Sequence, residues 1–140
     1  MAKKDPDQAD HPQRITVRTR SGSISATPGI YKFTRFRSQL EIAFVKELDA
    51  RQIRWFYEPE RLGRGHYLGD FYLPDCKSWV EVKGRLNSRD HLCLREVADS
   101  VGRERHHRLF MYTRTKAFVV SAGGFREISH EEFWGLLTSA

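Results

Sequence analysis

The sequence predicts a mixed α/β domain in which a central sheet is flanked by helices. Three segments carry apolar residues at helical spacing, and five others are β-rich runs bounded by turn residues. A chain of 140 residues with 39% hydrophobic residues suits one folded domain with its own core. In chain order the expected elements are α-β-β-β-α-β-β-α.

The first half of this order rests on one helix and three strands. Phe36 opens a helical pattern that continues through Leu40, Ala43, Phe44 and Leu48, and the helix is expected to end near Arg51. Residues 53–58 are β-rich and stop at a proline, after which residues 60–66 read as a basic loop. Residues 67–73 and 78–83 are two candidate strands, and the Pro-Asp-Cys-Lys turn between them predicts a hairpin.

The second half rests on two helices and two strands. A helix is expected from about Arg89 to Val101, with Ser88 as its cap and a glycine after its end. Residues 108–113 and 117–120 read as strands. The last helix begins at Ser129-His130-Glu131-Glu132, which has capping-box spacing.

Positive charge is concentrated near the start of the chain. The net charge is +6, and residues 11–37 contribute six bases and no acid. Residues 1–33 are therefore expected to form a flexible basic arm, and residues 34–140 the folded domain. Such an arm suits contacts with nucleic-acid phosphates, although it could equally be a solvated tail. The expected DNA-binding residues are Arg14, Arg18, Arg20, Lys32, Arg35, Arg37 and Arg64.

The composition excludes some other classes of protein. No apolar run approaches the length of a membrane span, and no stretch resembles a signal peptide. The two cysteines, Cys76 and Cys93, lack the spacing of a zinc site. We therefore expect a cytoplasmic protein with no membrane partner.

A cluster of charged residues lies on the predicted hairpin. Side chains alternate along a strand, so Glu81 and Lys83 point to one side while Val80 and Val82 can be buried on the other. Asp70 lies on the neighbouring strand, where it can face Glu81. Two adjacent carboxylates repel unless a cation lies between them, and oxygen ligands of this kind suit Mg²⁺ or Mn²⁺. The alternative is a solvated face of a hairpin.

Glu41 is a candidate third carboxylate. It shares a helix face with Phe44, Val45 and Leu48, which would turn it toward the sheet. However, Ser38 lies three residues earlier at capping-box spacing, so Glu41 can also act only as part of the helix start.

The series Glu41, Asp70 and Glu81-Val82-Lys83 resembles the PD-(D/E)xK nuclease superfamily. The likeness is closer to the phage endonuclease I group, which resolves Holliday junctions. It rests on four stretches across residues 36–113, namely FRSQLE, QIRWFYEPE, DFYLPD and EVKG with the following RLNSRDHLCLRE. The resemblance implies a restriction-endonuclease-like fold.

The resemblance also implies an activity and roles for residues. Asp70, Glu81, the backbone carbonyl of Val82 and Glu41 would bind Mg²⁺, for which Mn²⁺ would substitute, and Lys83 would orient or deprotonate water. The reaction would be hydrolysis of a DNA phosphodiester that leaves a 5′-phosphate, by a homodimer on branched or structured DNA. The chain would be encoded by a phage or a mobile element.

The sequence departs from this family at two places. Gly69 stands where the family usually has proline, and the segment from Glu58 to Asp70 is short, which puts a swapped dimer and junction specificity in question. A transposon-end or restriction-type nuclease of the same fold is therefore an alternative. A non-catalytic DNA-binding module on a nuclease fold is an alternative of another class, and a small basic protein that binds only through its arm is a third.

Overall fold

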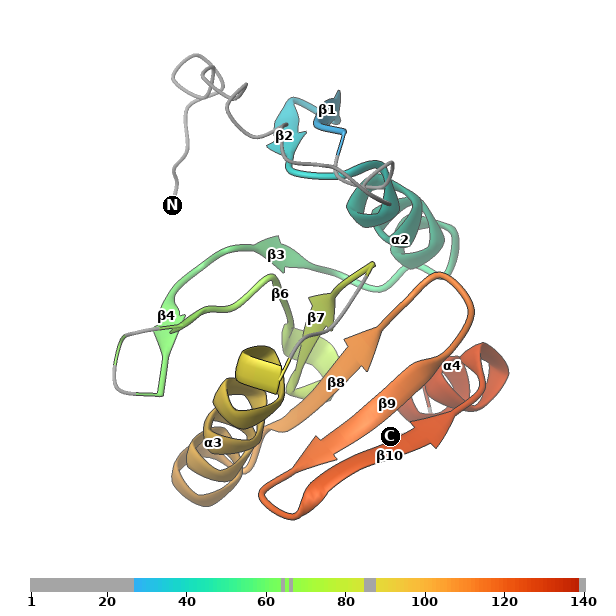
Figure 1. Ribbon diagram of the computed structural model, residues 1–140. Coiled ribbons are helices and arrows are strands. Elements are labelled where there is room, and N and C mark those ends of the chain that lie inside the picture. The colour runs from blue at the N-terminus through green and yellow to red at the C-terminus, as the bar shows by residue number, and fades with distance from the viewer. Residues whose placement is uncertain (1–26, 64, 66, 85–87, 139–140) are drawn as a thin grey trace. The chain divides into compact units, whose positions relative to one another are not determined.

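The computed structural model describes residues 27–63, 65, 67–84 and 88–138, and it divides into two units, Met1–Gln52 and Ile53–Ala140 (Figure 1). The described elements of the first unit are β1 (Gly29–Tyr31), β2 (Thr34–Phe36) and α2 (Gln39–Ala50). Those of the second are β3 (Phe56–Tyr57), β4 (Arg61–Leu62), β5 (Tyr67–Leu68), β6 (Phe71–Leu73), a 3-10 turn η3 (Pro74–Cys76), β7 (Ser78–Val82), α3 (Ser88–Arg105), β8 (Arg108–Tyr112), β9 (Ala117–Ser121), β10 (Gly124–Ile128) and α4 (His130–Thr138).

The first unit is an antiparallel hairpin, β1–β2, followed by α2. Ser38 caps the helix, because its Oγ accepts a hydrogen bond from the Glu41 N–H at 3.1 Å. The prediction that the helical pattern opens at Phe36 was therefore wrong, since Phe36 ends β2. Ala43 is exposed rather than on the buried face. The hairpin also crosses the boundary expected between residues 33 and 34.

The second unit is built on a six-stranded mixed sheet with the order β10-β9-β8-β7-β6-β3. Only β7 and β8 pair in parallel, and the other neighbours are antiparallel. A parallel pair needs a long crossover connection, and α3 provides it between β7 and β8. This arrangement confirms the mixed α/β class and the predicted hairpin between residues 67–73 and 78–83.

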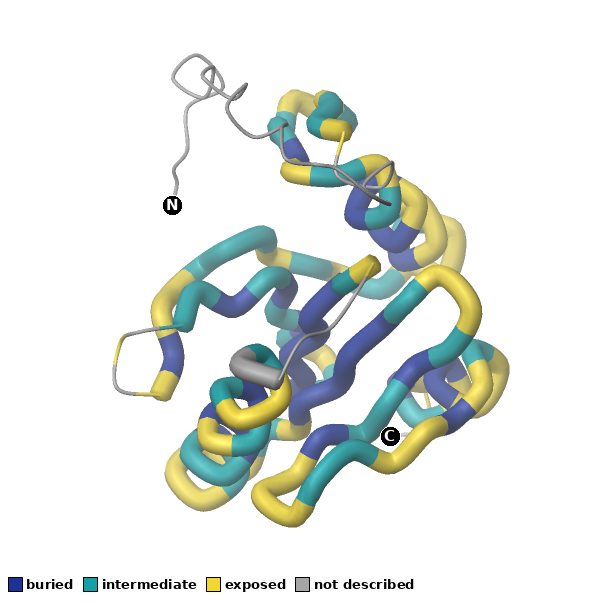
Figure 2. The backbone as a smooth tube through the Cα atoms, viewed as in Figure 1, coloured by how far each residue is buried: buried dark blue, intermediate teal, exposed yellow. Residues whose placement is uncertain are grey.

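The two helices of this unit lie on opposite faces of the sheet (Figure 1). Phe110 on β8 packs edge-on against Phe133 of α4, with ring centroids 5.3 Å apart. The next residue, Met111, points to the other face, where α3 packs. Buried residues are concentrated along β7 and β8 (Figure 2). The cluster on the α3 face consists of Leu62, Trp79, Leu94, Val97, Ala98, Val101, Leu109, Met111 and Val120.

The segment from β3 to β6 departs most from the predicted order. The strand expected over residues 53–58 is reduced to Phe56–Tyr57, and it ends before Glu58, which has a positive φ of 49°. The loop expected at residues 60–66 contains β4, which pairs with β5. The single strand expected at residues 67–73 is divided into β5 and β6 at Gly69 and Asp70. β10 was not predicted at all.

Within the part of the chain that the structure describes, no helix combines the length and the apolar character needed to cross a membrane.

Candidate active site

The β6–β7 pair brings Asp70 and Glu81 opposite each other. Phe71 is the partner of Val80 at the end of the antiparallel register, so continuing the register by one residue would set Asp70, in the bend before β6, opposite Glu81. Residues directly opposite each other point to the same face of a sheet. Glu81 shares that face with Trp79, which belongs to the cluster under α3. The predicted alternation along β7 agrees with this register, and Asp70 lies in the bend just before β6.

Asp70 is fixed by the backbone of β7. Its Oδ2 accepts a hydrogen bond from the Val82 N–H at 2.9 Å. The N–H and C=O of one strand residue point to the same neighbour, so the Val82 carbonyl also points toward the Asp70 side of β7. The opposite side of the strand is occupied by β8, where the next N–H, that of Lys83, donates to the Tyr112 carbonyl at 3.0 Å. The Asp70 carboxylate and the Val82 carbonyl thus lie on the same side of the strand.

Glu81 is a buried carboxyl group that lacks a full set of partners. It is 5% exposed, and its Oε1 is buried with no hydrogen-bond partner. Buried polar atoms are nearly always paired, so this oxygen is open to a ligand. Burial raises the pKa of Glu81 to about 8, with Lys83 opposing the rise and Asp90 and Glu58 adding to it. This site therefore disfavours a bare carboxylate and would favour a cation beside it.

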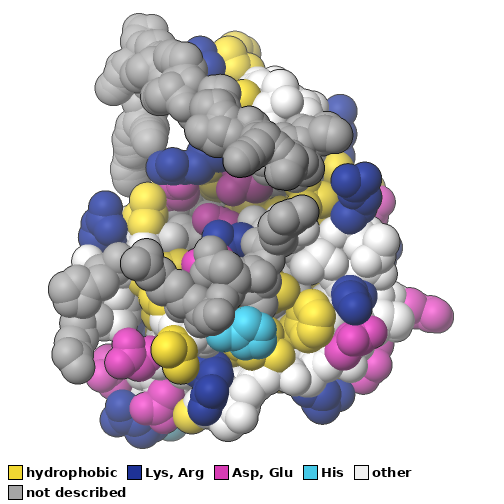
Figure 3. Space-filling view, in the orientation of Figure 1, with side chains coloured by type: hydrophobic (Ala, Val, Ile, Leu, Met, Phe, Trp, Pro, Cys, Tyr) yellow, Lys and Arg dark blue, Asp and Glu magenta, His cyan; other side chains and the backbone are white. Residues whose placement is uncertain are grey.

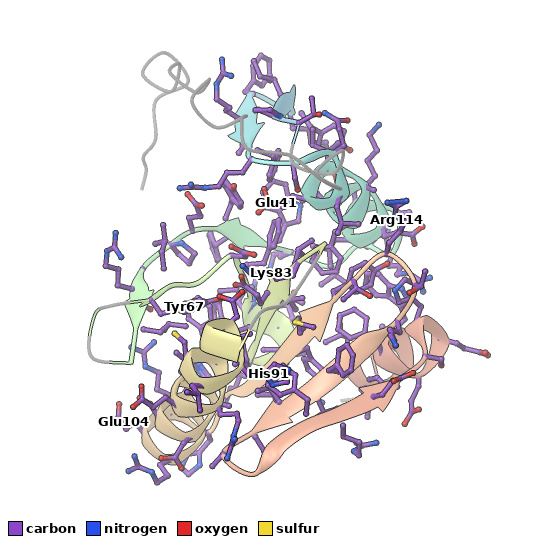
Figure 4. The ribbon with its side chains drawn as sticks, viewed as in Figure 1. Glu41, Tyr67, Lys83, His91, Glu104 and Arg114 are labelled. Carbon is purple, nitrogen blue, oxygen red and sulfur yellow. The ribbon has the colours of Figure 1, made fainter. Side chains whose placement is uncertain are left out.

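Lys83 directly follows β7, and its side chain reaches the first turn of α3, where Asp90 lies (Figure 4). Its Nζ lies 3.9 Å from Glu81 Oε2 and 3.4 Å from Asp90 Oδ2. Burial lowers the pKa of Lys83, but Glu81, Asp90 and Asp70 raise it by more, so the net shift is upward. The side chain is about one third exposed and stays a cation that solvent can reach.

Two acidic residues of this site, Asp90 and Glu58, were not predicted. Asp90 lies in the first turn of α3 and pairs with Lys83. Glu58 lies opposite Asp70, because Tyr57 pairs with Phe71 and the Glu58 N–H donates to the Asp70 carbonyl at 2.8 Å. A possible signal for Glu58 was its place at the end of a β-rich run, just before a proline. Asp90 carried no signal, since a helix start commonly has an acid.

A polar aromatic cluster lies on the same face of the sheet as Glu81. Trp79 Nε1 donates to His107 Nδ1 at 3.1 Å, and His107 Nε2 lies 3.3 Å from the Tyr72 hydroxyl. The Trp79 ring lies against Gly69, where an added Cβ would be 2.8 Å from it. This contact explains the glycine before Asp70, because any side chain there would collide with the indole ring.

Glu41 lies in the first unit, on α2, whereas the other three predicted residues lie in the second. It is buried, and its Oε1 accepts a hydrogen bond from the Arg37 N–H at 2.8 Å. Together with the Ser38 cap, this contact gives Glu41 a role at the helix start. The metal-binding role of Glu41 stays a prediction.

The predicted DNA-binding residues fall into two groups. Arg14, Arg18, Arg20 and Arg64 lie outside the described residues. Lys32 and Arg37 are exposed, and Lys32 Nζ lies 3.1 Å from Asp49 Oδ2. Arg35 is half-buried, and its Nε has no hydrogen-bond partner. The structure therefore places three of the seven on or beside the β1–β2 hairpin.

In comparisons with known proteins, no family model matches the chain, and neither a curated protein nor a solved structure does.

Proposed function

We propose that this chain is a magnesium-dependent endonuclease that hydrolyses DNA phosphodiester bonds on a restriction-endonuclease-like fold. The observation that carries the proposal is the buried, unpartnered Oε1 of Glu81, which lies across a strand pair from Asp70 and next to Lys83. A structural carboxylate in a core would have its oxygens paired. In an enzyme that binds a cation, by contrast, a carboxylate oxygen that serves as a ligand would have no hydrogen-bond partner from the protein.

The oxygen atoms of this site fit Mg²⁺. Asp70, Glu81 and the Val82 carbonyl, all in the second unit, would hold the ion. Among the described residues, no three His, Cys, Asp or Glu side chains form a metal-binding group. Mg²⁺ commonly binds through one or two carboxylates and keeps several waters or phosphate oxygens, so two carboxylates and one carbonyl would be enough ligands from the chain. When bound, the ion would supply an activated water and neutralise charge on the phosphate.

Lys83 has the position of a group that acts on water or phosphate. Asp90 holds the ammonium from one side at 3.4 Å, while Glu81 lies at 3.9 Å on the other. A lysine fixed in this way, with its side chain about one third exposed, keeps N–H donors that can orient water or a phosphate oxygen. Asp90 is therefore proposed as a positioning residue for Lys83.

The substrate class follows from the same proposal. We infer that the enzyme acts on branched or structured DNA as a homodimer and is encoded by a phage or a mobile element, because the ordered motifs from FRSQLE to EVKG resemble the junction-resolving group. A transposon-end or restriction-type nuclease would share the site and differ in the DNA it cuts.

The test combines substrates, metal and variants. The full chain is incubated with linear duplex, supercoiled plasmid and a four-way junction, in Mg²⁺ or in EDTA. Glu81→Gln and Lys83→Met are compared with Glu127→Gln, a surface control whose side chain is 61% exposed. Mg²⁺-dependent cutting by the wild type and by Glu127→Gln is expected, with a loss of about 10²-fold or more in the two site variants.

Three outcomes would contradict the proposal. Cutting that survives EDTA or Glu81→Gln would exclude the mechanism. Binding without any cutting would favour the non-catalytic DNA-binding module. Preferential cutting of plain linear duplex at fixed sites would favour the restriction-type alternative over the junction-resolving one.

A further inference from the structure

The tip of the β1–β2 hairpin has a conformation that its sequence does not favour. Tyr31 pairs with Thr34, so Lys32 and Phe33 form a two-residue turn. Both have positive φ, 52° and 65°. Turns of this kind strongly prefer Asn and Gly, and a bulky residue at positive φ is an outlier. Backbone strain of this sort is typical of positions that serve a function.

Phe33 at this tip is also almost fully in solvent. Its exposed fraction is 94%, compared with 60% for Ile30 and 66% for Leu92. Neither the turn nor a core therefore accounts for a phenylalanine here, since Asn or Gly would suit the backbone better and no apolar surface among the described residues covers the ring.

The hairpin tip is attached to α2 on the residues just before Phe33. Tyr31 Oη donates to Asp49 Oδ2 at 2.8 Å, and Lys32 Nζ lies 3.1 Å from the same oxygen. Lys46 Nζ lies 5.6 Å from the centroid of the Tyr31 ring. These contacts hold the turn in place, so the ring is presented on a fixed support.

The surroundings of the ring are basic. Arg35 and Arg37 follow it within four residues, and residues 11–37 contain no acid. Asp49 offsets part of the charge of Lys32, whose side chain is still 59% exposed. Basic and hydrophobic side chains lie next to each other at this hairpin (Figure 3). A flat apolar ring beside cations is the combination that stacks on a nucleobase while contacting phosphates.

We propose that Phe33 stacks on a nucleobase of DNA where the helical stack is open, as at a branch, gap or single-stranded segment. In a continuous duplex both faces of each base are covered, so the ring gains nothing there. The choice of DNA rests on the proposed function, and the hairpin would supply that enzyme with its preference for DNA structure over plain duplex.

The test measures binding of the full chain in EDTA, which prevents cutting. The probes are a continuous duplex and the same duplex with a one-nucleotide gap flanked by 2-aminopurine. Phe33→Asn is the main variant, because Asn suits a positive φ and removes the ring without straining the turn. Phe33→Trp keeps a stacking ring, and Leu92→Ala is the control for loss of another exposed apolar side chain.

Phe33→Asn is expected to weaken binding to the gapped DNA by about tenfold and binding to the duplex by less than about twofold. Wild type and Phe33→Trp should quench the 2-aminopurine fluorescence, and Phe33→Asn should not. Equal affinity of Phe33→Asn and wild type for gapped DNA would overturn the proposal, as would equal losses on both DNAs or no DNA binding by the wild type.

These results separate the inference from the proposed function. Ring-dependent binding without any Mg²⁺-dependent cutting would leave the stacking role and exclude the nuclease. If wild type and Phe33→Asn both cut DNA and bind the gapped DNA with equal affinity, the nuclease would stand and the stacking role would be excluded.

Discussion

Trp79 and Glu81 lie on the same face of β7, two residues apart, yet their polar groups differ in hydrogen bonding. The Trp79 N–H is paired with His107, which in turn contacts Tyr72. The Glu81 carboxyl is equally buried, but one of its oxygens has no partner. Paired buried groups stabilise a fold, whereas an unpaired one costs free energy. The contrast fits a stabilising role for the Trp79 end of β7 and the proposed metal-binding role for the Glu81 end.

The largest effect is expected when Glu81 is made apolar. Glu81→Leu removes a buried, partly unsatisfied carboxyl, so the free energy of unfolding in EDTA should rise by about 1–4 kcal/mol. Val80→Ala, a truncation on the opposite face of the same strand, should lower it by about 1–3 kcal/mol. Denaturant unfolding measures both. A Glu81→Leu protein less stable than wild type would mean that the carboxyl is structural.

A side chain at Gly69 should disturb the stable end of β7. A Cβ there would meet the Trp79 ring at 2.8 Å and Leu62 at 3.1 Å, so Gly69→Ala should cost about 1–3 kcal/mol by overpacking. Gly135→Ala is the matched control, because a Cβ there meets nothing within 4 Å and Ala favours the α4 helix. Opposite signs are expected in thermal unfolding, and equal shifts would contradict the close contact.

The Trp79–His107 pair predicts a pH dependence of stability. Burial lowers the pKa of His107, as do Arg105 and Lys77, against an opposing effect of Glu60. Below the usual histidine pKa the unfolded chain binds a proton more readily than the folded chain does. The free energy of unfolding should therefore be highest above about pH 6.5 and fall as the pH drops. Protonation would place a second donor at Nδ1, against the Trp79 N–H.

Unfolding curves at pH 7.5 and 5 check this dependence. His107→Asn keeps an acceptor without titrating and should reduce the difference between the two pH values. His106→Asn, at a neighbouring position with φ of 60° that Asn tolerates, removes only the last of the effects on the His107 pKa and should change the difference much less. The idea fails if the two variants behave alike.

The smallest effect is expected at Tyr67. Its hydroxyl is buried without a hydrogen-bond partner, so Tyr67→Phe removes no bond and should change the unfolding free energy by less than about 0.5 kcal/mol, or raise it slightly. Tyr72→Phe is the comparison, because that hydroxyl contacts His107, and it should cost about 1 kcal/mol. A larger loss at Tyr67 would show an interaction of its hydroxyl.

The sequence predicted the arrangement of the candidate site residues where strand alternation decides it. Glu81 and Lys83 had to share a face, and a tight turn had to bring Asp70 opposite Glu81. Glu58 and Asp90 could not be found in this way, because their places depend on which distant elements pack together. The β1–β2 hairpin escaped prediction because Lys32 and Phe33 are not the residues that such a turn normally uses. β10 escaped because exposed Arg126 and Glu127 interrupt its apolar pattern.

The central claim is that the unpartnered oxygen of Glu81 binds a metal ion. The melting temperature of the chain, measured with and without the ion and in the absence of DNA, tests this claim. A ligand that binds only the folded state raises the melting temperature. Titration with MnCl₂ should raise the melting temperature of the wild type and of Glu127→Gln, while the melting temperature of Glu81→Gln should not change. An equal rise in Glu81→Gln would contradict the claim, as would no rise in the wild type up to millimolar Mn²⁺.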